Sequence, residues 1–212
     1  MHLGFRMNSI LRMIFPLEHL LNFHHQKLLC APTSELRRVR GQTTALALWH
    51  RGSDVDLATY AMLQSRVTHG HLRSQVCCAL YCLWARRIMQ EATDPWREAV
   101  ETLRTTWGEN SREFAELDYY VRPYDLPPGE GSGYVVDSLR SAYWVMQEGS
   151  YQEVVRAAIA LGHDTDTTAC IAGGIAGLRD GISAIPQRWR DELRGQEIVA
   201  PLLSALIEKR FS

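Results

Sequence analysis

Apolar side chains recur every three to four residues along most of the chain, and almost no segment alternates with a period of two. From Leu72 onward this spacing predicts a long helix with one apolar face, formed by Val76, Leu80, Leu83, Trp84 and Ile88. The pattern returns after Asp94-Pro95, a capping residue followed by a proline suited to a first helical turn. We therefore predict an all-α fold, a compact single domain of seven or more helices.

Other local signals place helix starts. Ser53 followed by Asp56 has the spacing of a capping box and predicts a helix that begins there. Ser111 to Leu117 is expected to form a short helix, and Pro186 and Pro201 are each expected to begin one.

Residues 119–133 interrupt the periodicity with three prolines and three glycines. Such a composition predicts a loop. Long loops inside compact domains are commonly functional, so this segment is a candidate part of a site.

The first 44 residues show no clear apolar face and include the adjacent pair His24-His25, which we interpret as solvated. We therefore divide the chain into a divergent N-terminal segment, residues 1–44, and a helical domain, residues 45–212.

Composition narrows the functional classes. The chain has 212 residues with 23 basic and 24 acidic side chains, a balance that argues against nucleic acid as the main partner. Its five cysteines are odd in number and include no C-x-x-C pair, so we expect reduced, apolar cysteines in a cytoplasmic protein. No apolar run reaches the roughly 18 residues that span a bilayer, so no membrane association is expected.

The most informative segment is G-H-D-T-D-T-T-A-C-I-A-G-G-I-A-G, which contains Asp164, Asp166 and Thr167. Carboxylate and hydroxyl oxygens at the mouth of a helix suit a hard cation such as Mg²⁺ or Mn²⁺. The same residues can also act only as a helix cap and a turn. Gly173, Gly174 and Gly177 favour the site, because each costs roughly 1 kcal/mol in a helix and indicates a close approach of another backbone.

This segment strongly resembles the C-terminal signature of the ADP-ribosylglycohydrolases. Two further motifs match in the same order: S-R-V-T-H at residues 65–69, and G-S-G-Y-V-V-D-S-L at residues 131–139. The resemblance covers about residues 45 to 195. It implies a metal-dependent enzyme that hydrolyses the glycosidic bond between ADP-ribose and a modified protein or small molecule.

The resemblance also assigns residues. It makes Asp164, Asp166 and Thr167 ligands of a two-metal Mg²⁺ or Mn²⁺ centre, and His69 a contact to the ribose or diphosphate of ADP-ribose. Residues Gly131, Ser132, Gly133 and Tyr134 form its substrate loop, with Tyr134 as an aromatic surface. No residue is assigned as catalytic.

The N-terminal motifs of the family have no counterpart in this chain. It contains no Asp-Asp pair, and Asp54 and Asp56 are interpreted as helix-start residues. We therefore expect the N-terminal portion of the family fold to be missing or replaced, with half of the metal ligands absent and apolar surface exposed that favours self-association. The alternative to an active hydrolase is an inactive ADP-ribose-binding or structural relative.

Overall fold

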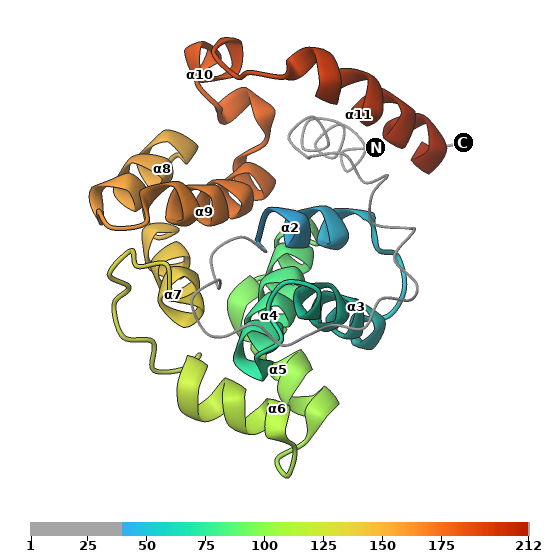
Figure 1. Ribbon diagram of the computed structural model, residues 1–212, viewed down its shortest axis with the longest axis vertical. Helices are drawn as coiled ribbons and strands as arrows, with labels where there is room; N and C mark the ends of the chain where they lie inside the picture. Colours follow the sequence, from blue (N-terminus) through green and yellow to red (C-terminus); the bar gives the residue numbers. More distant parts are fainter. Residues whose placement is uncertain (1–39, 212) are drawn as a thin grey trace.

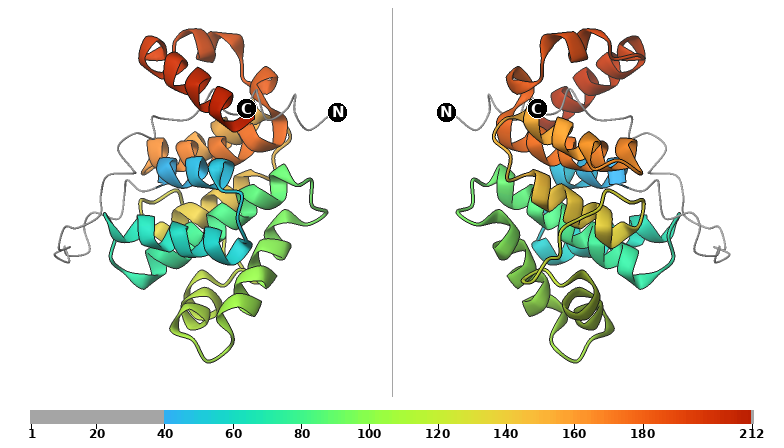
Figure 2. Two further views of the ribbon diagram at one scale, coloured as in Figure 1. Left: turned by 90° about the vertical axis from the view of Figure 1, so that its right-hand side faces the viewer. Right: turned by 90° about the vertical axis from the view of Figure 1, so that its left-hand side faces the viewer.

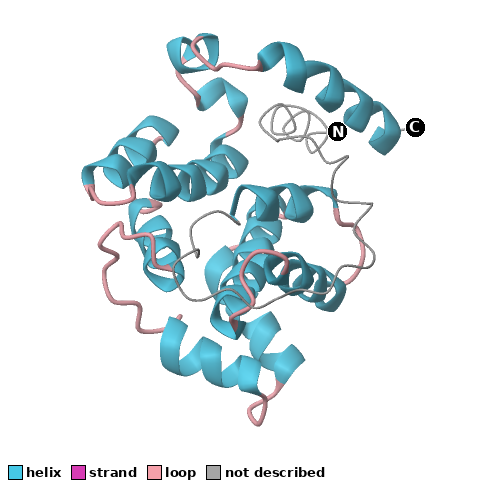
Figure 3. Ribbon diagram, viewed as in Figure 1, coloured by secondary structure: helices cyan, strands magenta, loops and turns pink. Residues whose placement is uncertain are grey.

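The computed structural model describes residues 40–211, so the first 39 residues of the predicted N-terminal segment 1–44, with the His24-His25 pair, lie outside them. Across the described range the chain forms helices joined by loops, without a strand (Figure 3). The predicted all-α class is confirmed. None of the described helices is long and apolar enough to cross a membrane.

Helix α4 (Leu72–Met89) is the centre of the fold. Packed around it are α2 (Arg40–Trp49), α3 (Asp54–Arg66), α5 (Pro95–Trp107) and α7 (Val135–Val145) (Figure 1). The prediction of one apolar face was wrong for α4, because small residues bury the remaining faces as well, namely Cys77, Cys78, Ala79, Cys82 and Ala85. The three cysteines are buried, form no disulfide with another described residue, and serve as small apolar residues, as predicted.

The predicted caps of α3 and α5 are present. Ser53 and Asp56 form the capping box of α3, and the carboxylate of Asp94 accepts a hydrogen bond from the backbone of Arg97 at the start of α5. Local sequence rules therefore identify both helix starts correctly.

Helix α6 (Arg112–Ala115) continues directly into η2, a π-helix over Glu116–Val121. The π-helix ends at Val121. The backbone N–H of the next residue, Arg122, donates to the carbonyl of Leu117 over 2.9 Å, five residues back. The loop predicted from residue 119 therefore begins three residues later, because the wider turn keeps residues 119–121 helical.

Helices α8 (Tyr151–Ala160) and α9 (Thr165–Asp180) pack against each other and on α7. The 3₁₀ turn η3 (Ile182–Ala184), α10 (Gln187–Asp191) and α11 (Gln196–Phe211) then lead away to one end of the molecule, opposite α6 (Figure 2). Pro201 lies inside α11 instead of beginning it, so that prediction was wrong.

The glycines of α9 do allow close approach, but of side chains and not of another backbone, so that part of the prediction was wrong. A Cβ atom on Gly174 would lie 2.7 Å from the hydroxyl of Tyr81 on α4, and one on Gly173 would touch the hydroxyl of Tyr151 on α8 at 3.4 Å. Tyr81 also lies 2.8 Å from the hydroxyl of Thr44. Thr44 lies within α2, which spans Arg40–Trp49 and therefore crosses residue 45, the predicted start of the helical domain.

Candidate functional site

The D-T-D-T segment lies at the N-terminal end of α9. Gly162 and His163 both adopt left-handed backbone conformations, with φ of 77° and 56°, and turn the chain sharply before Asp164. A left-handed histidine is unusual, and such strain is concentrated at functional positions. Helix α9 then begins at Thr165, so only Asp164 of the predicted ligands precedes it.

The carboxylate of Asp164 has an unusual environment. It makes no capping hydrogen bond to the start of α9, and its Oδ2 atom is buried without a hydrogen-bond partner. Buried polar atoms are nearly always paired, so one that is not indicates a place for an ion or ligand. Asp166 is exposed and Thr167 half-buried on the first turn of the same helix.

The structure brings the predicted substrate loop against this turn. The backbone N–H of Asp164 donates to the carbonyl of Gly131 over 3.0 Å. Gly131 is buried with φ of 75°, and a Cβ atom there would lie 2.7 Å from the Cβ of Leu161. Only glycine fits a left-handed conformation at such close contact, so two motifs that are 33 residues apart in sequence form one site.

Helix α7 holds the loop in place through side chains that the sequence analysis did not assign. The carboxylate of Asp137 accepts the backbone N–H groups of Glu130 and Ser132 over 2.8 and 2.6 Å. The hydroxyl of Ser141 accepts the N–H of Gly131 over 3.0 Å. The signal was available in part, because an acid in the first turn of a helix after a glycine-rich loop can bind the loop's free N–H groups.

Tyr134 is the residue directly before α7, and its side chain is 43% exposed. Its hydroxyl accepts a hydrogen bond of 2.7 Å from Nη1 of Arg73 on α4. Sequence reasoning missed Arg73, because nothing near it in the sequence indicates a partner 61 residues away.

His69 lies in the connection between α3 and α4, with 5% of its surface exposed. Its backbone N–H donates to Ser65 over 2.7 Å, and its Nδ1 lies 2.9 Å from the hydroxyl of Thr68. Two residues later, His71 caps α4 through Nδ1, which accepts from the backbone of Arg73. His69 is therefore a buried histidine beside the start of α4, and its contact with a ligand stays a prediction.

The residues present fit one hard cation better than two. Asp164, Asp166 and Thr167 offer two carboxylates and a hydroxyl, which suit Mg²⁺ or Mn²⁺ with water completing the shell. Throughout residues 40–211, no group of three or more His, Cys, Asp or Glu side chains gathers in a metal-binding arrangement. Among the described residues these are few donors for the two-metal centre that the family resemblance implies, and that centre stays a prediction.

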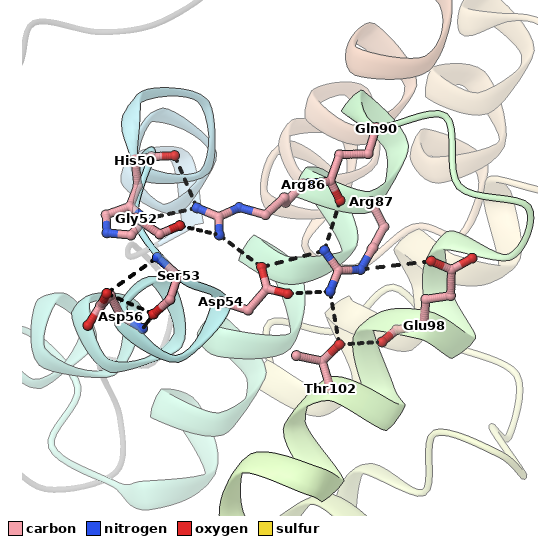
Figure 4. A network of polar contacts seen from close by, with 10 residues as sticks. All are labelled: His50, Gly52, Ser53, Asp54, Asp56, Arg86, Arg87, Gln90, Glu98 and Thr102. Atoms are coloured by element: carbon pink, nitrogen blue, oxygen red, sulfur yellow. Dashed lines mark hydrogen bonds and ion pairs between the residues drawn. The ribbon is translucent and has the colours of Figure 1, made fainter.

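The other Asp-x-Asp pair, at the start of α3, forms ion pairs and hydrogen bonds with neighbouring residues of the protein (Figure 4). Asp54 receives Arg86 over 2.8 Å and also pairs with Arg87, and Asp56 closes the capping box with Ser53. Burial alone would raise the pKa of Asp54, but the hydrogen bonds from Arg87 and Arg86 outweigh it and lower that pKa. The interpretation of these two acids as helix-start residues is confirmed.

A cavity of about 470 Å³ lies at the opposite end of α9 from the D-T-D-T turn. Its lining includes Trp84, Trp96 and Tyr143, whose rings pack edge to face or tilted against each other, together with Leu178 and Arg179 of α9. It contains none of the predicted site residues, so the candidate site does not extend into it.

Known proteins resemble this chain in sequence and in fold. The family model of the ADP-ribosylglycohydrolases matches residues 36–211. The ADP-ribosyl-[dinitrogen reductase] glycohydrolase of Rhodospirillum rubrum is 25% identical over 180 residues, which cover 81% of this chain and 56% of that protein. The ADP-ribosylarginine hydrolase Tri1 of Serratia proteamaculans (strain 568) is 40% identical over 76 residues, 35% of this chain and 21% of that protein.

A solved structure described as an ADP-ribosylglycohydrolase-related protein complex superimposes with a TM-score of 0.60 at 26% identity. That match covers 82% of this chain and 61% of the solved chain. The chain thus spans little more than half the length of the Rhodospirillum relative and about three fifths of the solved chain.

Proposed function

The chain belongs to the ADP-ribosylglycohydrolase family, and on that premise we propose that it binds ADP-ribose and hydrolyses its glycosidic bond to a modified protein or small molecule. The observation that carries this proposal is the hydrogen bond from the N–H of Asp164 to the carbonyl of Gly131. Through it, the substrate loop and the acidic turn named by the family motifs lie in direct contact. Both are held by rigid helices, as a site that must position a ligand requires.

Each element of this site has a proposed task. The backbone of residues 131–133 lies against ADP-ribose, Tyr134 offers its half-exposed ring, and His69 contacts the ribose or diphosphate. Asp164, Asp166 and Thr167 would hold Mg²⁺ or Mn²⁺, which when bound would supply Lewis acidity that lowers the pKa of water.

A second function is favoured by the small number of donors. Asp164, Asp166 and Thr167 fit one cation, and the described residues offer no further cluster of ligands. With a single, weakly held ion, the same loop and turn would bind ADP-ribose without turning it over. The chain would then recognise ADP-ribose instead of hydrolysing its bonds.

Two measurements separate these functions. The first is release of free ADP-ribose from ADP-ribosylarginine and ADP-ribosylserine in Mg²⁺, Mn²⁺ or EDTA. ADP-ribosylarginine is tested first, because the Serratia relative is an ADP-ribosylarginine hydrolase. The second is calorimetry with ADP-ribose in the same three conditions. Metal-dependent release that is abolished by Asp164→Asn supports the hydrolase, and binding without release supports the second function. Absence of both contradicts the proposal.

The cysteines support a reducing compartment for this activity. Cys77, Cys78 and Cys82 are buried in the central helix and Cys170 is exposed on α9, and none of the four forms a disulfide within the described part of the chain. Free thiols persist where the medium is reducing. We therefore propose that the protein acts in the cytoplasm.

A further inference from the structure

The guanidinium group of Arg73 connects three elements around the substrate loop. Its Nη1 donates to the hydroxyl of Tyr134 over 2.7 Å, and its Nε donates to the carboxylate of Glu116 over 2.8 Å. Its carbon atom Cζ lies 3.6 Å from the centre of the Tyr120 ring. The guanidinium group is thus held by hydrogen bonds at Nε and Nη1 and by an aromatic ring against one of its faces.

The π-helix supplies two of these three contacts. Glu116 is its first residue and Tyr120 its fifth, so one irregular turn presents a carboxylate and an aromatic face to the same guanidinium. π-turns are rare and occur frequently at functional sites. A hydrogen bond to a charged partner and a cation–π contact are each stronger than neutral contacts, and both side chains of the ion pair are less than 20% exposed.

We propose that Arg73 is a positioning residue, which fixes the ring of Tyr134 in the orientation that contacts ADP-ribose. This inference rests on the proposed function, because it takes Tyr134 as a ligand contact. The Tyr134 ring is 43% exposed while its hydroxyl is bound, so the ring offers a surface to a ligand in one orientation. Ordering a side chain before the ligand arrives removes part of the entropic cost of binding.

The chain offers a matched control in Arg104 of α5, whose ion-pair partner Asp118 lies on the same π-helix. Arg104 pairs with Asp118 and lies over the rings of Phe114 and Tyr124, at 4.6 and 5.3 Å from their centres. Arg104→Gln therefore removes an ion pair and cation–π contacts to this region without removing the bond to Tyr134. Any difference between Arg73→Gln and Arg104→Gln reports on Tyr134 more than on the general stability of the region.

The first test measures ADP-ribose binding by calorimetry on the full chain. Arg73→Gln is expected to weaken affinity about tenfold, while Arg104→Gln stays within about twofold of the unmodified chain and Arg73→Lys recovers part of the loss. In the Tyr134→Phe background, Arg73→Gln should have almost no further effect, because the two residues act as one unit. An equal loss in both backgrounds, or no loss in Arg73→Gln, overturns the proposal.

The second test needs no ligand. In protein labelled with 3-fluorotyrosine, the ¹⁹F resonance of Tyr134 is identified as the one that disappears in Tyr134→Phe. Arg73→Gln should shift and narrow this resonance as the ring gains freedom, and Arg104→Gln should leave it in place. If the resonance responds while the unmodified chain fails to bind ADP-ribose, the proposed function fails and the role of Arg73 stands. An unchanged resonance in Arg73→Gln overturns that role.

Discussion

Helices α3 and α9 each have an Asp-x-Asp pair at the N-terminal end, yet the first acids of the two pairs, Asp54 and Asp164, have opposite environments. At α3, Asp54 is bound by two arginines of α4 and Asp56 closes a capping box with Ser53. At α9, Asp164 makes no capping hydrogen bond, and one of its oxygen atoms is buried without a partner. The same sequence pattern therefore forms a structural joint of Asp54 with Arg86 and Arg87 in one place, and leaves Asp164 with an unpaired buried oxygen in the other.

The difference lies in what the neighbouring elements contribute. Helix α4 directs Arg86 and Arg87 at the start of α3, and Arg86 also donates to the carbonyls of His50 and Gly52. The start of α9 instead meets the backbone of the substrate loop, which brings a carbonyl for the N–H of Asp164 but no cation for its carboxylate. Acids that the fold satisfies stabilise it, whereas acids that it leaves unsatisfied are available to a ligand.

The largest expected effect tests the structural joint. Arg86→Ala removes hydrogen bonds to His50 and Gly52 of the α2–α3 connection and to Asp54 of α3, and it leaves part of the Asp54 charge unpaired. We expect it to lower the free energy of unfolding by about 3 kcal/mol, measured by urea denaturation. Arg66→Ala, an exposed arginine at the end of α3, is the control and should change little. A loss below about 1 kcal/mol would show that the joint is no more than a surface ion pair.

Next comes the contact between the loop and the turn. Gly131→Ala forces an alanine into φ of 75° and places its Cβ 2.7 Å from the Cβ of Leu161. We expect a loss of about 2 kcal/mol in unfolding free energy and weaker ADP-ribose binding. Gly108→Ala is the matched control, because Gly108 has φ of 69° and open space around it. Equal losses in the two variants would mean that crowding against Leu161 contributes nothing.

The third prediction addresses the open acid directly. Asp164→Asn should leave the free energy of unfolding within about 0.5 kcal/mol, or raise it slightly, because the substitution neutralises a half-buried carboxylate with one unpaired oxygen. Asp54→Asn should instead lower it by about 1 to 2 kcal/mol, because it weakens bonds to two arginines. Thermal unfolding with and without Mg²⁺ completes the comparison.

Mg²⁺ should raise the midpoint of the unmodified chain and of Asp54→Asn, but not that of Asp164→Asn. If Asp164→Asn destabilises the chain as much as Asp54→Asn does, the contrast between the two helix starts is refuted.

The smallest effect is a pH dependence within the joint. Burial lowers the pKa of His50, and the charge of Arg86 lowers it further, while Asp56 acts in the opposite direction. The unfolded chain then takes up the proton first, so stability should fall as the pH drops below the unperturbed value of 6.5 and through the lower pKa of the folded chain. His50→Gln should flatten urea midpoints between pH 7 and pH 5. If the urea midpoint of His50→Gln depends on pH as strongly as that of the unmodified chain, the pH dependence comes from other groups.

Features that depend on residues close together in the sequence could be predicted. Helix caps at Ser53 and Asp94 depend on residues two to four positions apart, and they were predicted correctly. The glycines of α9 indicated close packing but not the partner, which for Gly174 is the side chain of Tyr81. The family motifs, and not periodicity, pointed to the contact between the substrate loop and the acidic turn.

What could not be predicted are contacts that depend on the folded arrangement. Arg73 and Tyr134 are 61 positions apart, and Arg86 and Asp54 are 32 apart. No pattern in a single sequence shows which arginine a distant acid or hydroxyl will meet. The π-helix escaped prediction for a related reason, because its hydrogen bonds depart from the usual spacing while its residues still suit a helix.

That π-helix has a consequence for how the site can change over evolutionary time. Its closing bond, from Arg122 back to Leu117, spans one residue more than an α-helical bond would. Deleting a single codon within Glu116–Val121 would restore the ordinary repeat and turn everything on one side of the deletion by about 100° relative to the other. Glu116 and Tyr120 could then no longer face Arg73 together, so one small deletion would alter ligand preference without touching a residue that contacts the ligand.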